Sequence, residues 1–185
     1  LGFDAGILQV LFADYDHFKH VVDDDRVRAV FYTGSQEHCL ELRKDYAMIA
    51  GRELILQCGG KNAAIVHSSA DMDLAVQSVL YGAFNSAGQL CTSTSRVFVY
   101  RQALEEFSAK LKSACLNLNI GPTDTDTDVH MGPLYSKKAV DRFLRFQTMA
   151  TREAATTLLF GRLYEKSPSE GHFVQPGAYV FDRFD

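Results

Sequence analysis

Cysteine is scarce in this sequence, and no two cysteines have the spacing of a metal or redox motif. Cys39, Cys58, Cys91 and Cys115 form no CxxC pair and no Cys/His ligand pattern. We therefore expect no metal site, no small redox thiol protein, and free thiols in a reducing, cytoplasmic compartment. Cys115 falls on the apolar face of an expected helix, where cysteine acts as a small buried hydrophobe. Cys39 and Cys58 admit the same interpretation.

Excess positive charge and long apolar runs are also missing. The 19 lysines and arginines are outnumbered by 23 acidic residues, giving a net charge of -4 with no basic run, which argues against nucleic acid as a partner. The uncharged stretch after Asp73 carries polar residues in an amphipathic helical pattern, so it is not a membrane span. No basic segment precedes an apolar one at the N-terminus, and we expect neither a signal peptide nor a membrane partner.

Enough apolar material is present for a folded core, since 46% of the residues are hydrophobic and 23% are charged. A length of 185 residues indicates one or two domains. Early in the chain, short apolar runs predict strands over 7–12, 27–32 and 54–58, with a short helix over 14–22. Ser35 is the expected N-cap of a helix that runs to about Ala50, where Gly51 stops it. This strand-helix-strand order predicts parallel strands.

The same alternation restarts after Gly59-Gly60. We expect strands over 63–66, 96–100, 156–160 and 172–175, and helices over 72–84, 104–118 and 137–150. A loop rich in Asp and Thr separates the last two helices, over 121–134. The predicted domain boundary lies near Cys58-Gly59.

The segment around Cys91 is the most informative one. It reads Gly88-Gln89-Leu90-Cys91 and follows an apolar helix-patterned run. A structural cysteine would normally lie inside such a run, whereas a thiol among small and polar residues at a helix-to-loop break can meet a substrate.

Three motifs, in a fixed order along the chain, strengthen the interpretation of Cys91 as a reactive thiol. Tyr32-Thr33-Gly34-Ser35, Gln57-Cys58-Gly59-Gly60-Lys61-Asn62 and the Cys91 segment resemble the patterns F-T-G-S, E-L-G-G-K and G-Q-x-C of the NAD(P)-dependent aldehyde dehydrogenase superfamily. The spacings are similar too, with 23 residues from Gly34 to Gln57 and 34 from Gln57 to Cys91. Further positions that look like the family are Arg96, Met131-Gly132-Pro133 and Phe173-Val174-Gln175-Pro176.

The resemblance implies an α/β fold with a partial Rossmann-type cofactor domain followed by an α/β catalytic domain. It assigns residues 1–58 to the end of the NAD(P)-binding domain and residues 59–185 to an incomplete catalytic domain. The chain then looks like an internal portion of a longer, homo-oligomeric enzyme, and we expect little turnover from this portion alone. Segments outside it would set the aldehyde and the choice of NAD or NADP.

A cofactor site is expected at the turn of Thr33, Gly34 and Ser35, with Glu37 and Gly59 as further candidates. Without the resemblance, the turn is interpreted as the capped N-terminus of a helix, although its free backbone N–H groups could also bind a phosphate. The resemblance places it near the pyrophosphate and nicotinamide of NAD or NADP. Cys39 stands where the family pattern has a glycine, which is a departure at this site.

Cys91 is the nucleophile that the resemblance implies. Its thiolate would attack an aldehyde to give a thiohemiacetal and, after hydride transfer, a thioester. The backbone N–H of Cys91 and a side-chain amide would stabilise the oxyanion, and the family's amide comes from an asparagine before Leu1. The alternative is an inert buried thiol.

Gln57 is the main departure from the family. Its position belongs to a glutamate that acts as general base, and an amide has no useful basicity. The explanations left open are weak hydrolysis in a natural variant, acyl transfer to coenzyme A, a catalytically dead member that keeps the fold, and an engineered change. Coenzyme A-acylating relatives also lack the glutamate, but their G-A-K-N pattern differs from Gly59-Gly60-Lys61-Asn62.

Several polar residues have ordinary structural interpretations. We expect Lys61 to form a salt bridge or to lie at the surface. We expect Arg96 to form an ion pair that supports the fold. Asp124, Asp126 and Asp128 superficially resemble a calcium loop, but Val129 and Tyr135 occupy positions that need Gly and Glu. The six histidines show no ligand spacing.

Overall fold

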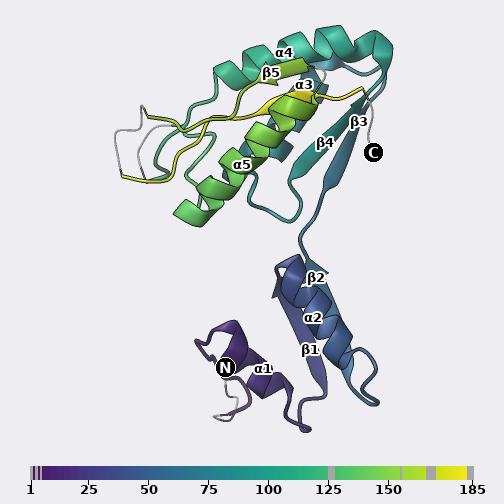
Figure 1. Cartoon of the computed structure of the whole chain (residues 1–185), viewed down its shortest axis with the longest axis vertical. Coiled ribbons are helices and arrows are strands. Elements are labelled where there is room, and N and C mark those ends of the chain that lie inside the picture. The colour runs from purple at the N-terminus through teal and green to yellow at the C-terminus, as the bar shows by residue number, and fades with distance from the viewer. Residues whose placement is uncertain are drawn as a thin grey trace. The chain divides into compact units, whose positions relative to one another are not determined.

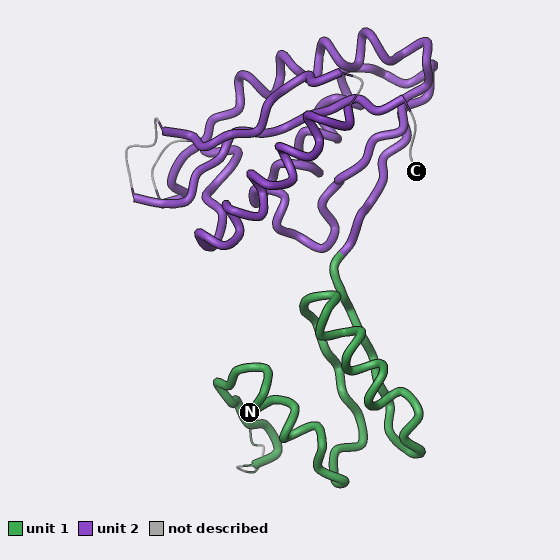
Figure 2. The backbone as a smooth tube through the Cα atoms, viewed as in Figure 1, with its two compact units in different colours: residues 1–59 green, residues 60–185 purple. Residues whose placement is uncertain are grey.

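The chain folds into two compact units in a computed structural model that describes residues 2, 4, 6–124, 128–154, 156–165 and 170–182. The units are Leu1–Gly59 and Gly60–Asp185, coloured green and purple in Figure 2. Their division lies beside the predicted boundary at Cys58-Gly59. Assigning the units to a cofactor domain and a catalytic domain stays a prediction.

The first unit is built on two parallel strands covered by a helix. Its elements are α1 (Tyr15–Val22), β1 (Ala29–Gly34), α2 (Gln36–Tyr46) and β2 (Glu53–Cys58). Figure 1 shows α2 lying along the β1–β2 ribbon, and its buried Leu42 and Tyr46 pack with Val22 and Val30. The parallel pairing of β1 with β2 confirms the prediction from the strand-helix-strand order.

The strand predicted over residues 7–12 was wrong. The described residues there form no strand, and their apolar side chains are open to solvent, with Leu8 84% and Phe12 96% exposed. A strand needs a neighbour that accepts its backbone hydrogen bonds. The ladder described in this unit joins only β1 and β2. The helix predicted to reach Ala50 ends at Tyr46, and Gly51 lies in the following turn with φ at +73°.

The described residues of the second unit form two small sheets and three long helices. Its elements are β3 (Asn62–Val66), α3 (Met72–Phe84), η1 (Asn85–Gly88), β4 (Thr94–Val99), η2 (Arg101–Ala103), α4 (Leu104–Leu116), α5 (Lys137–Glu153), β5 (Thr156–Leu159) and β6 (Ala178–Val180). β3 and β4 are parallel, whereas β5 and β6 are antiparallel. One core, formed by β3, α3 and α4, comprises Val66, Val76, Val79, Phe107, Leu111 and Cys115.

A second core lies beneath α5. It comprises Ile120, Met131, Leu134, Ala139, Val140, Phe173 and Val174. The strand predicted over 172–175 is not formed: His172 and Val174 make isolated bridges, and β6 begins at Ala178. The two bridges go to different segments, to Leu134 and to Leu163, so no continuous ladder forms, although Phe173 and Val174 are both buried.

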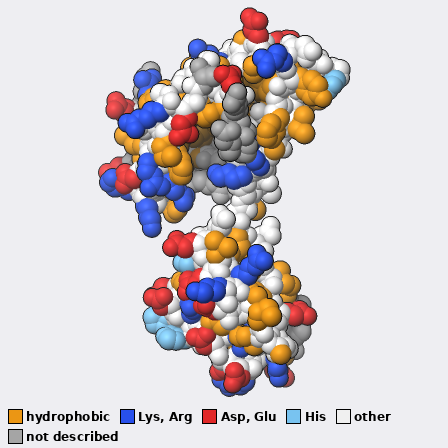
Figure 3. Space-filling view, turned by 45° about the vertical axis from the view of Figure 1, so that its right-hand side comes forward, with side chains coloured by type: hydrophobic (Ala, Val, Ile, Leu, Met, Phe, Trp, Pro, Cys, Tyr) orange, Lys and Arg blue, Asp and Glu red, His pale blue; other side chains and the backbone are white. Residues whose placement is uncertain are grey.

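Both parallel strand pairs keep apolar side chains at the surface. Figure 3 shows hydrophobic side chains, in orange, on the surface of both units. Phe31 and Ile55 are exposed on β1 and β2, and Ile65 and Phe98 on β3 and β4. No helix among the described residues is long and apolar enough to cross a membrane. Across the same ranges, no group of three or more His, Cys, Asp or Glu residues could hold a metal ion. Asp126 of the calcium-like segment lies outside the described residues.

Candidate functional site

The turn between β1 and α2 gathers four predicted site residues at one end of the β1–β2 ladder. Thr33 stands opposite Gln57, and Gly34 stands opposite Cys58. Ser35 is the N-cap of α2, as predicted, and its Oγ accepts a hydrogen bond from the His38 backbone N–H at 3.3 Å. Ligands of parallel sheets bind at the carboxyl ends of the strands, which is where this turn lies.

The two glycines at this end of the ladder have different surroundings. A Cβ on Gly34 would collide with the Tyr32 ring, so the position accepts no larger residue without a shift of that ring. Gly59 has φ at +59° and nothing within 4 Å of the point where a Cβ would lie. Glu37 is exposed in the first turn of α2.

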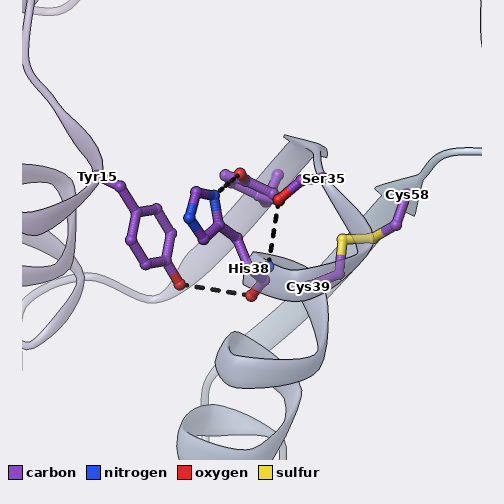
Figure 4. Close-up of a disulfide and its surroundings, with 6 residues drawn as sticks. Tyr15, Ser35, His38, Cys39 and Cys58 are labelled. Carbon is purple, nitrogen blue, oxygen red and sulfur yellow. Dashed lines mark hydrogen bonds between the residues drawn. A yellow bond between two sulfur atoms is a disulfide. The ribbon is translucent and has the colours of Figure 1, made fainter. Parts of the chain in front are cut away.

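Cys39 and Cys58 form a disulfide, which corrects the expectation that they are free thiols. The bond joins the first turn of α2 to the last residue of β2 (Figure 4), and the two Cα atoms lie 6.2 Å apart. That separation is within the range of protein disulfides. No pattern in the sequence predicts this bond, because the cysteines are 19 residues apart and only the fold brings them together.

Aromatic contacts hold the start of α2 in place. The Tyr15 ring stacks on His38 with centroids 3.7 Å apart, and its hydroxyl donates to the His38 carbonyl oxygen at 3.4 Å. The Tyr32 hydroxyl is hydrogen-bonded to His38 Nδ1 at 3.0 Å. Figure 4 shows Tyr15 beside His38, so α1 and β1 both support the turn that begins at Ser35.

The Cys91 thiol follows a turn with an uncommon backbone conformation. Ser86, Ala87 and Gly88 have φ of 55°, 54° and 68° in succession directly after α3. The left-handed region costs a non-glycine residue about 1–2 kcal/mol. Such strain persists only where surrounding contacts determine the conformation, and it often marks functional sites. Beyond this turn, Cys91 is exposed and its thiol is free.

Side-chain hydrogen bonds to other segments fix the Cys91 loop. Asn62 Nδ2 donates to the Cys91 carbonyl oxygen at 2.7 Å and to that of Ser93 at 3.3 Å. Gln89 Nε2 donates to the Pro133 carbonyl oxygen at 3.1 Å, while its Oε1 accepts from the Tyr135 N–H at 3.0 Å. The loop is therefore tied to β3 on one side and to the segment before α5 on the other.

Arg96 has a structural role in this unit. Its guanidinium donates two hydrogen bonds to the Lys61 carbonyl oxygen, one of them from Nε at 3.0 Å. These bonds connect β4 to the residue just before β3, and they place Arg96 among the supports of the Asn62 segment. The architectural interpretation of Arg96 agrees with them, although the partner is a backbone carbonyl.

Cys115 provides an internal contrast to Cys91. It is buried in the α3–α4 core, as expected, and burial raises the pKa of its thiol to about 11. At neutral pH almost none of it is the reactive thiolate. Its role is packing.

Iodoacetamide at pH 7.5 should therefore modify the exposed Cys91 much faster than the buried Cys115, because the raised pKa lowers the Cys115 thiolate fraction about 100-fold below that of an ordinary thiol and burial restricts access. The Cys115 rate should climb with pH and level off only above about pH 11. Peptide mass spectrometry of the timed reaction measures both rates. Equal rates in the folded chain would contradict the difference in burial, and Cys91→Ser is the control for peptide assignment.

Gly60 packs directly on the Cys91 backbone. A Cβ at Gly60 would collide with the Cys91 carbonyl oxygen. Gly60→Ala should therefore displace the loop and lower the free energy of unfolding by about 1–3 kcal/mol, the usual cost of overpacking. Thermal or denaturant unfolding measures the loss. The matched control is Gly121→Ala, whose Cβ would meet only Val129 Cγ2 at 3.7 Å, and equal stability of the two variants would refute the close contact.

The predicted site residues fall into both units. Thr33, Gly34, Ser35, Glu37, Gln57 and Gly59 belong to the first unit and Cys91 to the second. The sequence reasoning assigned no role to Asn62 or Gln89, although both stand inside the quoted motifs. The signal that could have found them is a side-chain amide within two residues of a motif glycine, Gly60 for Asn62 and Gly88 for Gln89. Hydrogen-bond donors of that kind commonly fix loops.

Comparisons with known proteins agree with the motifs. The model of the aldehyde dehydrogenase family matches residues 1–183. Alpha-ketoglutaric semialdehyde dehydrogenase of Bacillus subtilis is 36% identical over 163 residues, covering 88% of this chain and 33% of the relative.

Solved structures show the same likeness. Succinate-semialdehyde dehydrogenase from Burkholderia pseudomallei aligns with a TM-score of 0.85 at 26% identity, over 95% of this chain and 36% of that one. Betaine aldehyde dehydrogenase from Staphylococcus aureus, in complex with NAD+, aligns with a TM-score of 0.71 at 26% identity, over 82% of this chain and 30% of that one. The chain thus spans about a third of the length of these relatives. From the match over residues 1–183, the three ordered motifs and the shared fold, the chain belongs to the aldehyde dehydrogenase family.

Proposed function

We propose that the natural protein carrying this chain oxidises an aldehyde to a carboxylic acid with NAD(P)+, and that Cys91 is its nucleophile. The observation that carries the proposal is the exposed, free Cys91 thiol on a loop fixed by Asn62, Gly60 and Gln89. Family membership supports the reaction class. The relatives are named for different aldehydes, so the substrate class is left at aldehydes in general.

The first chemical step forms a bond between Cys91 Sγ and the aldehyde carbon. Attack requires the thiolate, and the carbonyl oxygen becomes an oxyanion. The Cys91 backbone N–H is the donor that we assign to this oxyanion, together with a side-chain amide. Asn62 is not that amide, because its Nδ2 donates to the carbonyl oxygens of Cys91 and Ser93. A loop fixed before the reaction keeps the sulfur in position.

The cofactor site that we propose is the turn of Thr33, Gly34 and Ser35, with Gly59 beside it. The turn suits a dinucleotide phosphate, because it lies at the carboxyl end of a parallel strand and at the N-terminus of α2, where backbone N–H groups are available. The space around Gly59 is open. The Glu37 carboxylate in the same turn suits a hydroxyl group better than a phosphate. When bound there, NAD(P)+ supplies the hydride acceptor.

The last step removes the acyl group from Cys91, and here Gln57 matters. A glutamine amide can orient a water molecule but cannot take its proton. We therefore propose slow hydrolysis of the Cys91 thioester. The same residue favours a second candidate function, acyl transfer to coenzyme A, whose thiol needs less help as a nucleophile than water. The Gly59-Gly60-Lys61-Asn62 segment, which lacks the G-A-K-N pattern, favours hydrolysis over that alternative.

Steady-state NADH formation from a panel of aldehydes, with and without coenzyme A, tests the proposal in the natural protein. Slow turnover that coenzyme A leaves unchanged is expected. Acceleration by coenzyme A, with an acyl-coenzyme A product, would replace hydrolysis with acyl transfer. No NADH from any aldehyde, together with no aldehyde adduct on Cys91, would reassign the protein as a non-catalytic member that retains the fold.

Because the chain spans about a third of its relatives' length, we expect the 185-residue chain by itself to show little or no turnover. Rates like those of an intact enzyme from this chain would contradict that. A homo-oligomeric natural protein, which the family resemblance implies, and a cytoplasmic location, which the cysteine spacing predicts, belong to the same proposal.

A further inference from the structure

Near the candidate cofactor turn, cysteine replaces the residue of the family pattern at two positions. The Cys39–Cys58 bond joins these two positions. Cys39 replaces the glycine expected after Ser35-Gln36-Glu37, and Cys58 replaces the leucine of E-L-G-G-K. One disulfide accounts for both departures. We propose that Cys39 and Cys58 form a reversible thiol–disulfide exchange site, whose co-reactant is a low-molecular-weight disulfide of the glutathione type.

The placement of the bond gives it a local effect. The β1–β2 ladder ends at the pair Gly34 and Cys58, and α2 begins one residue after Ser35. The disulfide adds a link from the first turn of α2 back to the end of β2, as Figure 4 shows. The turn between β1 and α2 is then closed by the ladder on one side and by the sulfur bridge on the other. Oxidation therefore stiffens this turn beside Gln57.

The surrounding contacts allow both oxidation states to fold. Ser35 caps α2, His38 is held by Tyr15 and Tyr32, and Leu42 is fully buried, all without help from the bond. A disulfide that is not needed to hold its elements together can open and close without unfolding the unit. Cytoplasmic disulfides, where they occur, are typically transient ones of this sort.

The exchange takes two balanced steps. Cys58 is half-buried between the exposed Gln57 and Gly59, whereas Cys39 is buried, so Cys58 is the sulfur that a small molecule reaches. The Cys58 thiolate attacks one sulfur of the small disulfide, forms a mixed disulfide and releases one small thiolate. The Cys39 thiolate then attacks the Cys58 sulfur and releases the second. Two protein thiols lose two electrons, and the small disulfide becomes two thiols.

The exchange does not use the proposed nucleophile, since neither Cys91 nor Cys115 is part of the bond. Its test is equilibration of the 185-residue chain with glutathione mixtures, followed by acid quench, alkylation and peptide mass spectrometry. We expect a Cys39–Cys58 peptide in oxidising mixtures, with Cys115 alkylated and the exposed Cys91 alkylated or capped by glutathione, and four alkylated cysteines in reducing mixtures. At a fixed thiol-to-disulfide ratio, fourfold more total glutathione should lower the ratio of bridged to reduced chain fourfold, as an intramolecular bond requires.

Controls make the outcome decisive. Cys58→Ser and Cys39→Ser should each abolish the bridge, while Cys115→Ala and Cys91→Ser should leave it intact. Amide exchange at His38 and Cys39 should slow on the order of 100-fold on oxidation, the effect of closing a loop of this length, while α4 amides stay unchanged. Four free thiols in every glutathione mixture, glutathione adducts on Cys39 or Cys58 without a bridge, or a bridge that includes Cys91 would each overturn the proposal.

Discussion

Replacing Cys91 with serine should reduce aldehyde oxidation by the natural protein that carries this chain by roughly 10⁴-fold or more, the scale of losing a covalent nucleophile. A serine hydroxyl needs a general base to become a nucleophile, and the neutral amide of Gln57 cannot supply one. The variant should bind aldehyde but form no covalent adduct, and steady-state NADH formation together with intact-protein mass spectrometry measures both.

Cys115→Ala is the matched control for that loss. It removes a thiol that is buried in the α3–α4 core, so it should lower stability slightly and leave the rate per folded molecule unchanged. A Cys91→Ser protein that retains a tenth or more of the activity would remove Cys91 from the chemistry.

Gln57→Glu should raise steady-state turnover by about 10²–10⁴-fold, the usual contribution of a positioned general base. The change keeps the side-chain length at an exposed position of β2, so the fold should tolerate it. The effect should fall on kcat, because hydrolysis of the thioester limits the cycle. The pH profile should also gain an acidic limb in which turnover is lost as the new carboxylate is protonated.

The comparison variant is Gln57→Met, which keeps the length but has neither an amide nor a base. It should give no gain in turnover. Equal gains in turnover from Gln57→Glu and Gln57→Met would mean that the glutamine side chain obstructs the site sterically. No gain from Glu would mean that acyl release is not the slow step, or that Gln57 does not face the thioester.

Local patterns predicted much of the fold correctly. α3 runs over Met72–Phe84 as its apolar spacing predicts, and Ser35 caps α2 through its own Oγ. These features depend on neighbours within a few residues, which a sequence displays directly. The parallel pairing of β1 with β2 followed equally from the intervening helix.

Features that depend on distant partners could not be predicted. The run 7–12 is as apolar as a strand, but whether it pairs depends on a neighbour elsewhere, and here it is exposed. The Cys39–Cys58 bond depends on packing α2 against β2. The left-handed conformation of Ser86 and Ala87 has no signal in residue type, because non-glycine residues rarely adopt it. Nucleophile candidates are visible in a sequence, whereas the contacts that hold them are visible only in the structure.

The most direct test of the account is a rapid-mixing measurement of NADH formed in the first turnover of the natural protein with an accepted aldehyde. If Cys91 forms an acyl intermediate and Gln57 cannot help water release it, NADH should appear in a burst of about one equivalent per Cys91 and then nearly stop. Gln57→Glu should convert the stall into continuous turnover. The absence of a burst in both forms, with Cys91 still free by mass, would contradict the central claim that Cys91 is the nucleophile.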